Sequence, residues 1–211
     1  RDYRSSRGLG DVYQRQTFSG DEFPFIVQNR TMAGQFSAHV MTSIISGFII
    51  SFPYILYEFW KFISPGLLEK ERAKSRGFIF ISSLLFFIGV LFGYYIISPL
   101  SINFLGTYQV SSQVLNEIDL GSFISLVRSS AIASGIIFEL PIIIYFLTKA
   151  GVVTPDSLVK YRKYALVLVL VLAAIITPPD VASQIIVAIP IVVLYQVSIF
   201  ISKIVVKNQG K

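Results

Sequence analysis

The sequence predicts an all-α protein, a polytopic bundle of transmembrane helices. Of the 211 residues, 54% are hydrophobic and only 14% are charged. The mean hydropathy is +0.68, far from the average of soluble globular proteins. Five stretches are long and apolar enough to cross a bilayer. Because backbone groups in lipid must be paired within each segment, these stretches are expected to be helices.

The five expected spans leave no room for a separate soluble domain. Residues 1–36 are expected to form an ordered extracytoplasmic loop or cap, residues 37–203 the transmembrane core, and residues 204–211 a cytoplasmic tail. The expected spans, whose ends are good to a few residues, are Ser37–Ile63, Phe78–Ser98, Phe123–Leu147, Tyr164–Thr177 and Ile185–Ser202.

Lysine and arginine residues indicate which segments face the cytoplasm. Residues 61–76 contain five of them, residues 149–163 four and residues 203–211 three. Residues 99–122 and 178–184 contain none. Since cytoplasmic segments of membrane proteins carry an excess of Lys and Arg, the three basic segments are predicted to be cytoplasmic.

This topology places residues 1–36 outside the cytoplasm, although they contain five arginines. The chain begins with Arg1 and shows no signal-peptide pattern. We therefore expect a further span upstream, so that the intact protein would have six helices and both termini in the cytoplasm.

The first expected span ends in an aromatic belt that is typical of a membrane interface. Glu58 lies at this depth and is expected to reach the headgroup layer as a solvated carboxylate. The following loop carries Glu69 and Glu71, which could accept paired hydrogen bonds from a guanidinium group. The residues alone favour a simpler interpretation, in which this mixed-charge loop is a solvated face with weak local ion pairs.

The second expected span contains Gly89 and Gly93, a spacing of small residues that favours close contact with another helix. Pro99 is expected to mark its outer end. The outer loop that follows is expected to carry one surface turn. Its carboxylates, Glu117 and Asp119, are most simply interpreted as solvated.

The third expected span carries Glu139 near its middle. A carboxylate at the bilayer centre costs about 2.5–3.5 kcal/mol on insertion scales, which makes Glu139 a functional candidate. The alternative is a packing role, in which Glu139 is protonated and hydrogen-bonded to a neighbouring helix. Pro141 is expected to bend the helix beside it. Arg128 is eleven residues earlier, about 16 Å along the helix, and is expected to snorkel to the outer headgroups.

The last two expected spans are connected by short, capped turns. Thr154 is expected to cap the helix that begins at Pro155. The fourth span has only fourteen residues, about 21 Å of helix against about 30 Å of hydrocarbon, so it must thin the bilayer or stand beside a tolerant partner. Asp180 is expected to cap the final helix, which Pro190 and Gln196 are expected to interrupt.

Several function classes find no support in the sequence. The chain has no cysteine and a single histidine, His39, for which a structural role is expected, so neither a metal site nor a cofactor is indicated. The net charge of +6 comes from residues between spans and reports topology, not nucleic-acid binding. The serines have no nearby histidine partner, so no catalytic site is expected and the protein is predicted not to be an enzyme.

Five ordered motifs resemble those of the TatC family, the multi-spanning receptor subunit of the twin-arginine protein translocase. They cover about residues 31–203, and one of them follows the aromatic end of the first span. The matching stretches are Phe62–Arg72, Leu85–Leu105, Phe138–Pro141, Gly151–Asp156 with Tyr161–Tyr164, and Thr177–Gln184.

The resemblance implies a glove-shaped bundle of six helices in the bacterial plasma membrane. It also implies that the protein recognises folded export cargo through twin-arginine signal peptides, with transport driven by the protonmotive force and no catalytic step. In the family, the glutamate that matches Glu71 helps bind the arginine pair, and Phe62 and Pro65 shape the same surface. Arg72 belongs to this expected signal-peptide site. The resemblance favours a binding role for Glu71 over the solvated-loop interpretation.

The resemblance also assigns partner contacts. Glu139 matches a buried family glutamate on the concave side, which is thought to engage partner subunits or the inserted signal. Thr177 and Gln184, with Asp180 between them, match a polar cluster where single-span TatA/TatB-type subunits dock. Assembly with further TatC copies is expected as well. Gln196 stands where some relatives carry an acid.

One departure from the family and one competing class remain. The family's cytoplasmic N-terminus and first helix, with acidic residues that complete the signal-peptide site, are not in this chain, so normal signal binding is expected only when they are restored.

The competing class is a proton-coupled secondary transporter of a small solute that uses Glu139. The sequence shows no internal repeat, and five or six spans are few for that architecture.

Overall fold

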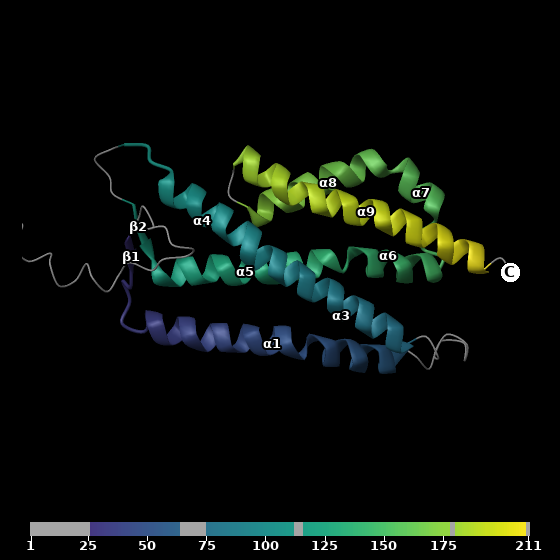
Figure 1. The fold of residues 1–211 in the computed structure, drawn as a ribbon, viewed down its shortest axis with the longest axis horizontal. Coiled ribbons are helices and arrows are strands. Elements are labelled where there is room, and N and C mark those ends of the chain that lie inside the picture. Colours follow the sequence, from purple (N-terminus) through teal and green to yellow (C-terminus); the bar gives the residue numbers. More distant parts are fainter. Residues whose placement is uncertain (1–25, 64–74, 112–115, 178–179, 210–211) are drawn as a thin grey trace, which may run out of the picture.

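The structure, a computed structural model, describes residues 26–63, 75–111, 116–177 and 180–209 (Figure 1). Helices dominate the fold, so the predicted class, an all-α transmembrane bundle, is confirmed. The helices are α1 (Gly34–Ile63), α3 (Ser75–Phe92), a π-helical turn (Gly93–Ile97), α4 (Ser98–Thr107), α5 (Leu120–Phe138), α6 (Leu140–Lys149), α7 (Pro155–Lys160), α8 (Arg162–Ile176) and α9 (Val181–Gln209).

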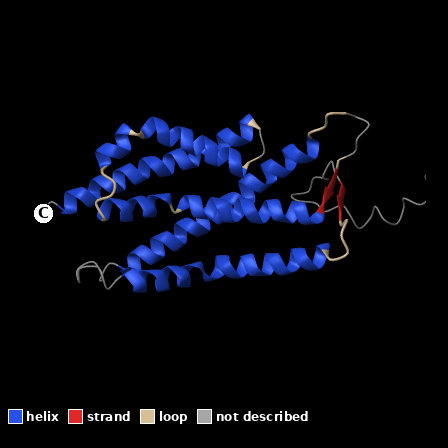
Figure 2. Cartoon of the chain, turned by 180° about the vertical axis from the view of Figure 1, so that it is seen from behind, coloured by secondary structure: helices blue, strands red, loops and turns tan. Residues whose placement is uncertain are grey.

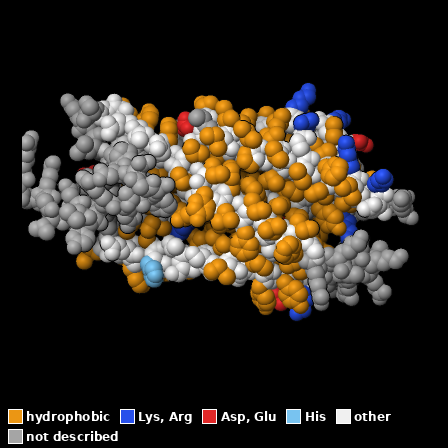
Figure 3. Space-filling model, in the orientation of Figure 1, with side chains coloured by type: hydrophobic (Ala, Val, Ile, Leu, Met, Phe, Trp, Pro, Cys, Tyr) orange, Lys and Arg blue, Asp and Glu red, His pale blue; other side chains and the backbone are white. Residues whose placement is uncertain are grey.

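The helix α5 and its continuation α6 form the centre of the bundle (Figures 1 and 2). Helix α1 lies along one side of them and the α8–α9 pair along the other, while α3 and α4 cross α5 at an angle. One end of the molecule contains Ile63 and Lys149, and most of the lysine and arginine side chains of the described residues that Figure 3 shows gather there; we call it the basic end. The opposite end contains two short strands, and we call it the sheet end.

Four helical segments within the described residues are long and apolar enough to cross a membrane: Gly34–Phe62, Gly77–Thr107, Leu120–Lys149 and Ser183–Asn208. Their hydrophobic side chains cover most of the visible surface between the two ends (Figure 3). The fourth expected span corresponds to α8, which has 15 residues, about 22 Å of helix. The predicted shortness of this segment is confirmed.

Close packing of α3 on α5 depends on two glycines. A Cβ atom placed on Gly89 would lie 2.8 Å from both the Cβ of Phe138 and the backbone oxygen of Ser134. A Cβ on Gly93 would collide with the backbone of Ser130 and Ala131. Only residues without a side chain let the two helices approach so closely, so the predicted small-residue contact is confirmed.

The expectation that Pro99 ends the second span is wrong, because the chain stays helical to Thr107. Proline has no N–H group and clashes with the preceding turn of a regular helix. Here the π-helical turn lies just before it, and Pro99 occupies the first turn of α4, where no N–H partner is needed. The Ser98 hydroxyl donates to the Gly93 carbonyl oxygen (2.8 Å), which satisfies that widened turn.

Helix α9 also differs from its expected form. It runs without interruption from Val181 to Gln209 and includes Pro190, so the expected interruption at Pro190 and Gln196 is wrong. Membrane helices tolerate proline because nearby groups satisfy the freed carbonyl. The helix also continues through residues 204–209, which were expected to form a tail.

A two-stranded parallel sheet at the sheet end was not anticipated. Strand β1 (Ile26–Gln28) pairs with β2 (Glu117–Asp119), with Val27 opposite Ile118. It joins segments that lie about ninety residues apart in the sequence. The strand β1 lies within residues 1–36, which were expected to form an ordered loop or cap before the first span.

Candidate functional site

Glu139 lies at the junction between α5 and α6 and is buried, with 8% of its surface exposed. The carbonyl oxygen of Glu139 accepts the backbone N–H groups of Ile142 (2.9 Å) and Ile143 (3.0 Å), which start α6. Pro141 lies in the first turn of α6, and the regular helix is interrupted at Glu139, where Pro141 was expected to bend it.

The side chain of Glu139 reaches across to α3. The Ser82 hydroxyl donates a hydrogen bond to Glu139 Oε2, and Ser82 is itself fully buried. The second carboxyl oxygen, Oε1, is buried and has no hydrogen-bond partner in the described part of the chain. The expected hydrogen bond to a neighbouring helix is therefore present, and one oxygen is left over. A structural role alone does not account for that oxygen.

The expected signal-peptide residues lie at the basic end, and only one of them falls in the described part of the chain. Phe62, in the last turn of α1, is 84% exposed. Pro65, Glu71 and Arg72, and Glu69 beside them, lie outside the described residues. The ends of the intervening segment are Ile63 of α1 and Ser75 of α3.

A cluster of aromatic rings fixes these two helix ends. Trp60 of α1, only 7% exposed, lies 5.0 Å (ring centroids) from Phe78 of α3 and 5.9 Å from Phe146 of α6. Phe78 and Phe146 meet edge to face at 4.7 Å. Tyr145 stacks on Phe78 at 6.4 Å, and the Lys149 ammonium group lies 5.8 Å from the Tyr145 ring. We call Trp60, Phe78, Tyr145 and Phe146 the aromatic cluster; ring pairs of this kind stabilise a packing arrangement beyond their buried area.

At the same depth, Glu58 and Lys61 of α1 form an ion pair of 3.8 Å between two exposed side chains. Glu58 was expected to be a solvated carboxylate, and its exposure agrees with that expectation. Such surface pairs contribute little to stability.

The tip of the α8–α9 hairpin brings together the three residues expected to contact partner subunits. Thr177 is only 5% exposed, and its hydroxyl donates to the Ala173 carbonyl (2.8 Å). Asp180 Oδ2 accepts the backbone N–H of Ser183 (2.8 Å) and its hydroxyl (2.7 Å), which confirms the predicted cap of α9. Gln184 donates to the Leu170 carbonyl (3.0 Å) and so ties α9 to α8.

Further along this hairpin, two contacts were not predicted from the sequence. With the Gln196 amide turned so that its oxygen faces α8, that oxygen accepts from Arg162 Nε and Nη2, both at 2.9 Å. The Tyr195 hydroxyl donates to the Leu158 carbonyl (2.8 Å). On the preceding turn, Thr154 and Ser157 form a capping box, so the predicted cap by Thr154 is confirmed.

Glu117 is exposed and Asp119 partly exposed, which agrees with their interpretation as solvated, and both also make contacts that the sequence did not predict. Glu117 Oε2 accepts from Arg30 Nη2 at 3.3 Å. The Asp119 carboxylate accepts the backbone N–H of Arg30 (3.4 Å) and that of Ser122 (3.2 Å), so it caps α5 and holds β1 against β2. The Asp-x-x-Ser pattern at the start of α5 is a helix-start signal that could have revealed this cap.

The expectation that Arg128 snorkels to the headgroups stays a prediction; the residue as a whole is partly exposed. Its Nε and Nη1 atoms are buried and have no hydrogen-bond partner in the part of the chain that the structure describes. Arg128 occupies the face of α5 that carries Gly135, seven residues later. Gly135 packs on Phe86 of α3, so this face points into the bundle.

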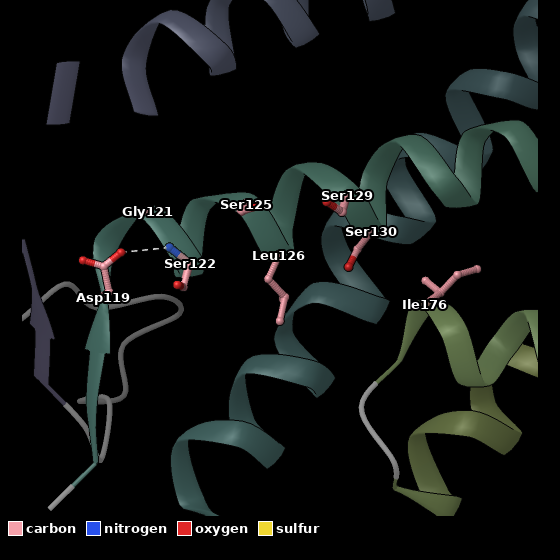
Figure 4. A pocket seen from close by; sticks show the side chains of 8 residues that line it. All are labelled: Asp119, Gly121, Ser122, Ser125, Leu126, Ser129, Ser130 and Ile176. Carbon is pink, nitrogen blue, oxygen red and sulfur yellow. Dashed lines mark hydrogen bonds between the residues drawn. The ribbon is translucent and has the colours of Figure 1, made fainter. Parts of the chain in front are cut away.

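A groove of about 520 Å³ opens beside α5 near the sheet end (Figure 4). Ser122, Ser125 and Ser129 of α5 are exposed, and Ile176 of α8 lies on the side of α5 to which Leu126 and Ser130 point. Its lining residues are Asp119, Gly121, Ser122, Ser125, Leu126, Ser129, Ser130 and Ile176.

The predicted site residues thus fall into separate regions of the molecule. Phe62 is at the basic end, Glu139 lies in the centre, and Thr177, Asp180 and Gln184 are at the α8–α9 tip. Arg128 and the serine-lined groove are not among the predicted site residues of these three regions.

A family model described as Sec-independent protein translocase protein (TatC) matches residues 11–190. The protein of that name from Blattabacterium sp. subsp. Periplaneta americana is 47% identical over 209 residues, which cover 98% of this chain and 79% of that protein. The Aquifex aeolicus protein is 42% identical over 173 residues, which cover 81% and 71%.

Solved structures agree. A crystal structure of the twin arginine translocase receptor TatC superposes with a TM-score of 0.69 at 38% identity, covering 85% of this chain and 79% of that one. A second crystal structure of this receptor, in DDM, gives 0.70 at 39% identity, covering 83% and 78%.

Proposed function

The chain belongs to the TatC family of Sec-independent protein translocase proteins, and from this premise we propose that it receives twin-arginine signal peptides at its basic end. Members of this family are transport components and not enzymes, and the chain is a multi-pass membrane protein. Beyond family membership, the proposal names the ligand, the binding surface on this chain and the orientation of the chain in the membrane.

The aromatic cluster is the observation that supports the binding surface best. It holds the end of α1 beside the start of α3, so that the segment between them, which contains Pro65, Glu71 and Arg72, leaves the bundle from a fixed base. Phe62 projects from the same base. A carboxylate such as that of Glu71 can accept two parallel hydrogen bonds from a guanidinium group, which suits the arginine pair of a signal peptide.

The basic end is proposed to face the cytoplasm, where cargo folds. Lysine and arginine side chains gather at this end (Figure 3), as the excess of basic residues in cytoplasmic segments requires. The C-terminal end of α9 lies at the same end and is therefore proposed to be cytoplasmic.

Assembly is the second part of the proposal. The α8–α9 tip, with Thr177, Asp180 and Gln184, is proposed to receive single-span TatA/TatB-type subunits, and Glu139 to act after signal binding. The later role of Glu139 is supported by its carboxyl group, because one buried carboxyl oxygen has no partner in the described residues. Protonmotive force is proposed to drive the transport step, and further copies of the chain to join the complex.

Site-specific photo-crosslinking tests the proposal. A photoreactive residue in place of the exposed Phe62, which leaves Glu71 in place, should capture a twin-arginine signal peptide and not the same peptide with two lysines, in the protein expressed from its complete gene. The matched control is the same photoreactive residue in place of Tyr108, an exposed residue between α4 and β2. Equal capture at both positions would overturn the proposed surface. Solute uptake into vesicles that is lost in Glu139→Ala would instead identify a transporter.

A further inference from the structure

Arg162, the first residue of α8, carries a positive charge that its partner on α9 does not neutralise. The amide oxygen of Gln196 accepts from Arg162 Nε and Nη2, both at 2.9 Å. This contact holds the guanidinium group against α9, but an amide is uncharged. Arg162 is exposed and forms no salt bridge within the described residues. The guanidinium group has five N–H donors, so after this contact it still has donors to offer.

Two lysines enlarge the positive charge beside Arg162. Lys160 stands two residues before it and Lys163 directly after it, and both are exposed. The Cα atoms of residues 160–163 lie within about 11 Å of each other, about one Debye length, so their fields add. Lysine and arginine side chains gather over α7 and the start of α8 (Figure 3). Asp156 is the only acid in the described residues of α6, α7, α8 and α9.

These cations are recessed from the ends of the neighbouring helices. Arg162 lies level with Gln196 of α9, as their contact shows. Thr148, next to the last residue of α6, donates to Ser202 of α9 at 2.9 Å, six residues or about 9 Å further along that helix. Helix α9 ends only at Gln209, about 20 Å beyond Gln196. The start of α8 therefore lies nearer to the membrane than these ends, within reach of the headgroup layer.

The surface below the cations is apolar and open to the surroundings. Tyr161 and Tyr164 are exposed at its upper edge, with ring centroids 6.1 Å apart. Tyrosine rings of this kind are typical of the headgroup level of a membrane. The exposed apolar side chains of α8 follow directly after them: Leu166, Val167, Leu168, Leu170 and Val171. The start of α8 thus combines a cationic edge with an apolar face, which complements a lipid that has an anionic headgroup.

We propose that Lys160, Arg162 and Lys163 bind the headgroup of an anionic phospholipid, with its phosphate on the Arg162 guanidinium group and its acyl chains along α8. Guanidinium and phosphate groups form strong charge-assisted hydrogen bonds. Gln196 is a positioning residue, because it orients the guanidinium group and leaves its charge uncompensated. An acidic peptide would match the charge but would leave the apolar face of α8 uncovered. The site does not depend on signal-peptide reception at the basic end.

Lipid binding to the purified whole chain tests this inference. The probes are phosphatidylglycerol and phosphatidylcholine with the same acyl chains, and native mass spectrometry counts the bound lipids. Phosphatidylglycerol should bind about tenfold more tightly, since each basic residue near the surface contributes about 1 kcal/mol. Arg162→Gln should reduce this preference about fivefold. Lys207→Gln, which removes a cation about 16 Å further along α9 than Gln196, should leave the preference unchanged.

A substitution at Gln196 tests the positioning role without removing any cation. Gln196→Glu keeps an acceptor for the Arg162 guanidinium group and neutralises its charge. The preference for phosphatidylglycerol should therefore fall about fivefold, as in Arg162→Gln, while the melting temperature without lipid should not fall. The matched control is Asn208→Glu, which adds the same charge at an exposed position near the end of α9. It should leave the preference unchanged.

Several results would contradict the inference. They are equal binding of the two lipids, a preference that persists in Gln196→Glu, or an equal loss in Asn208→Glu, which would show that only net charge matters. If inorganic phosphate raises the melting temperature as much as phosphatidylglycerol does, the site takes free anions and not lipid. Tighter binding of a hexaglutamate peptide than of phosphatidylglycerol would identify an acidic protein partner. If Arg162→Gln fails to fold, Gln196→Glu decides, because it keeps the contact between α8 and α9.

Discussion

The hydroxyl of Ser82 in α3 donates a hydrogen bond to the carboxyl group of Glu139, and both residues are buried where these helices cross. The contact joins positions 57 residues apart and links the candidate functional carboxyl group to the best-packed helix pair of the bundle. The glycines Gly89 and Gly93 bring α3 close to α5 along the same crossing. Packing and function therefore meet at one place.

The coupling between Ser82 and Glu139 should be measurable. Ser82→Ala leaves both carboxyl oxygens of Glu139 without a partner in the described residues, so thermal unfolding in detergent should show a loss of about 1 kcal/mol. A double-mutant cycle with Glu139→Leu should give a coupling of about 0.5–1.7 kcal/mol. Ser43→Ala, which removes a hydroxyl that bonds only to its own helix, is the control. Additive effects of the two substitutions would contradict the contact.

Removal of the buried carboxyl group should separate two steps of transport. Glu139→Ala is expected to keep the affinity for a twin-arginine signal peptide, because Glu139 lies far from the basic end, and to reduce export of a folded cargo strongly. Peptide binding to purified protein and cargo export in cells measure the two steps. Loss of signal-peptide binding in Glu139→Ala would show that Glu139 acts at the binding step and not after it.

The α3–α5 contact should not tolerate a side chain at its glycines. Gly93→Val forces a methyl group into the backbone of Ser130 and should destabilise the protein by about 1–3 kcal/mol. The yield of monodisperse protein and its melting temperature report the effect. Gly47→Val in α1 is the matched control, because a Cβ there meets no atom within 4 Å. A similar loss in both variants would point to helix propensity and not to packing.

The aromatic cluster should control signal binding without touching the signal. Trp60→Ala removes ring contacts to Phe78 and Phe146 worth about 1 kcal/mol, so capture of the signal peptide at position 62 should fall about fivefold. Trp60→Phe should retain most of the capture.

The control for the cluster is Tyr54→Ala, an exposed ring on the same helix whose ring contact is to Tyr57. It should leave capture unchanged. Normal capture by Trp60→Ala would show that signal-peptide binding does not depend on the aromatic cluster.

Local signals in the sequence predicted a large part of this structure. Apolar runs located the spans, and Pro141, Thr154 and Asp180 marked a bend and two caps, because each acts on backbone groups within four residues. Features that depend on residues distant in the sequence were not predicted. The Arg30–Glu117 pair joins residues 87 apart, and the burial of Arg128 depends on which face of α5 meets other helices.

The same contrast between local signals and distant neighbours holds for the candidate site. Glu139 could be singled out because an acid in an apolar run is costly in any fold. Its partner Ser82 could not, since nothing in the sequence around Ser82 distinguishes it from Ser83, which bonds to its own helix. Pro99 misled us because a π-helical turn ahead of a proline leaves no clear local signal.

The shortness of α8 has an electrical consequence. The tip of the α8–α9 hairpin stops short of the sheet-end starts of α1 and α5 (Figure 1), and α8 supplies only about 22 Å of helix against about 30 Å of hydrocarbon. Where the bilayer thins to match α8, the same transmembrane voltage falls over a shorter distance, so the field there is steeper by roughly a third. A charge that moves beside this hairpin would do more electrical work per ångström than one elsewhere on the protein's perimeter.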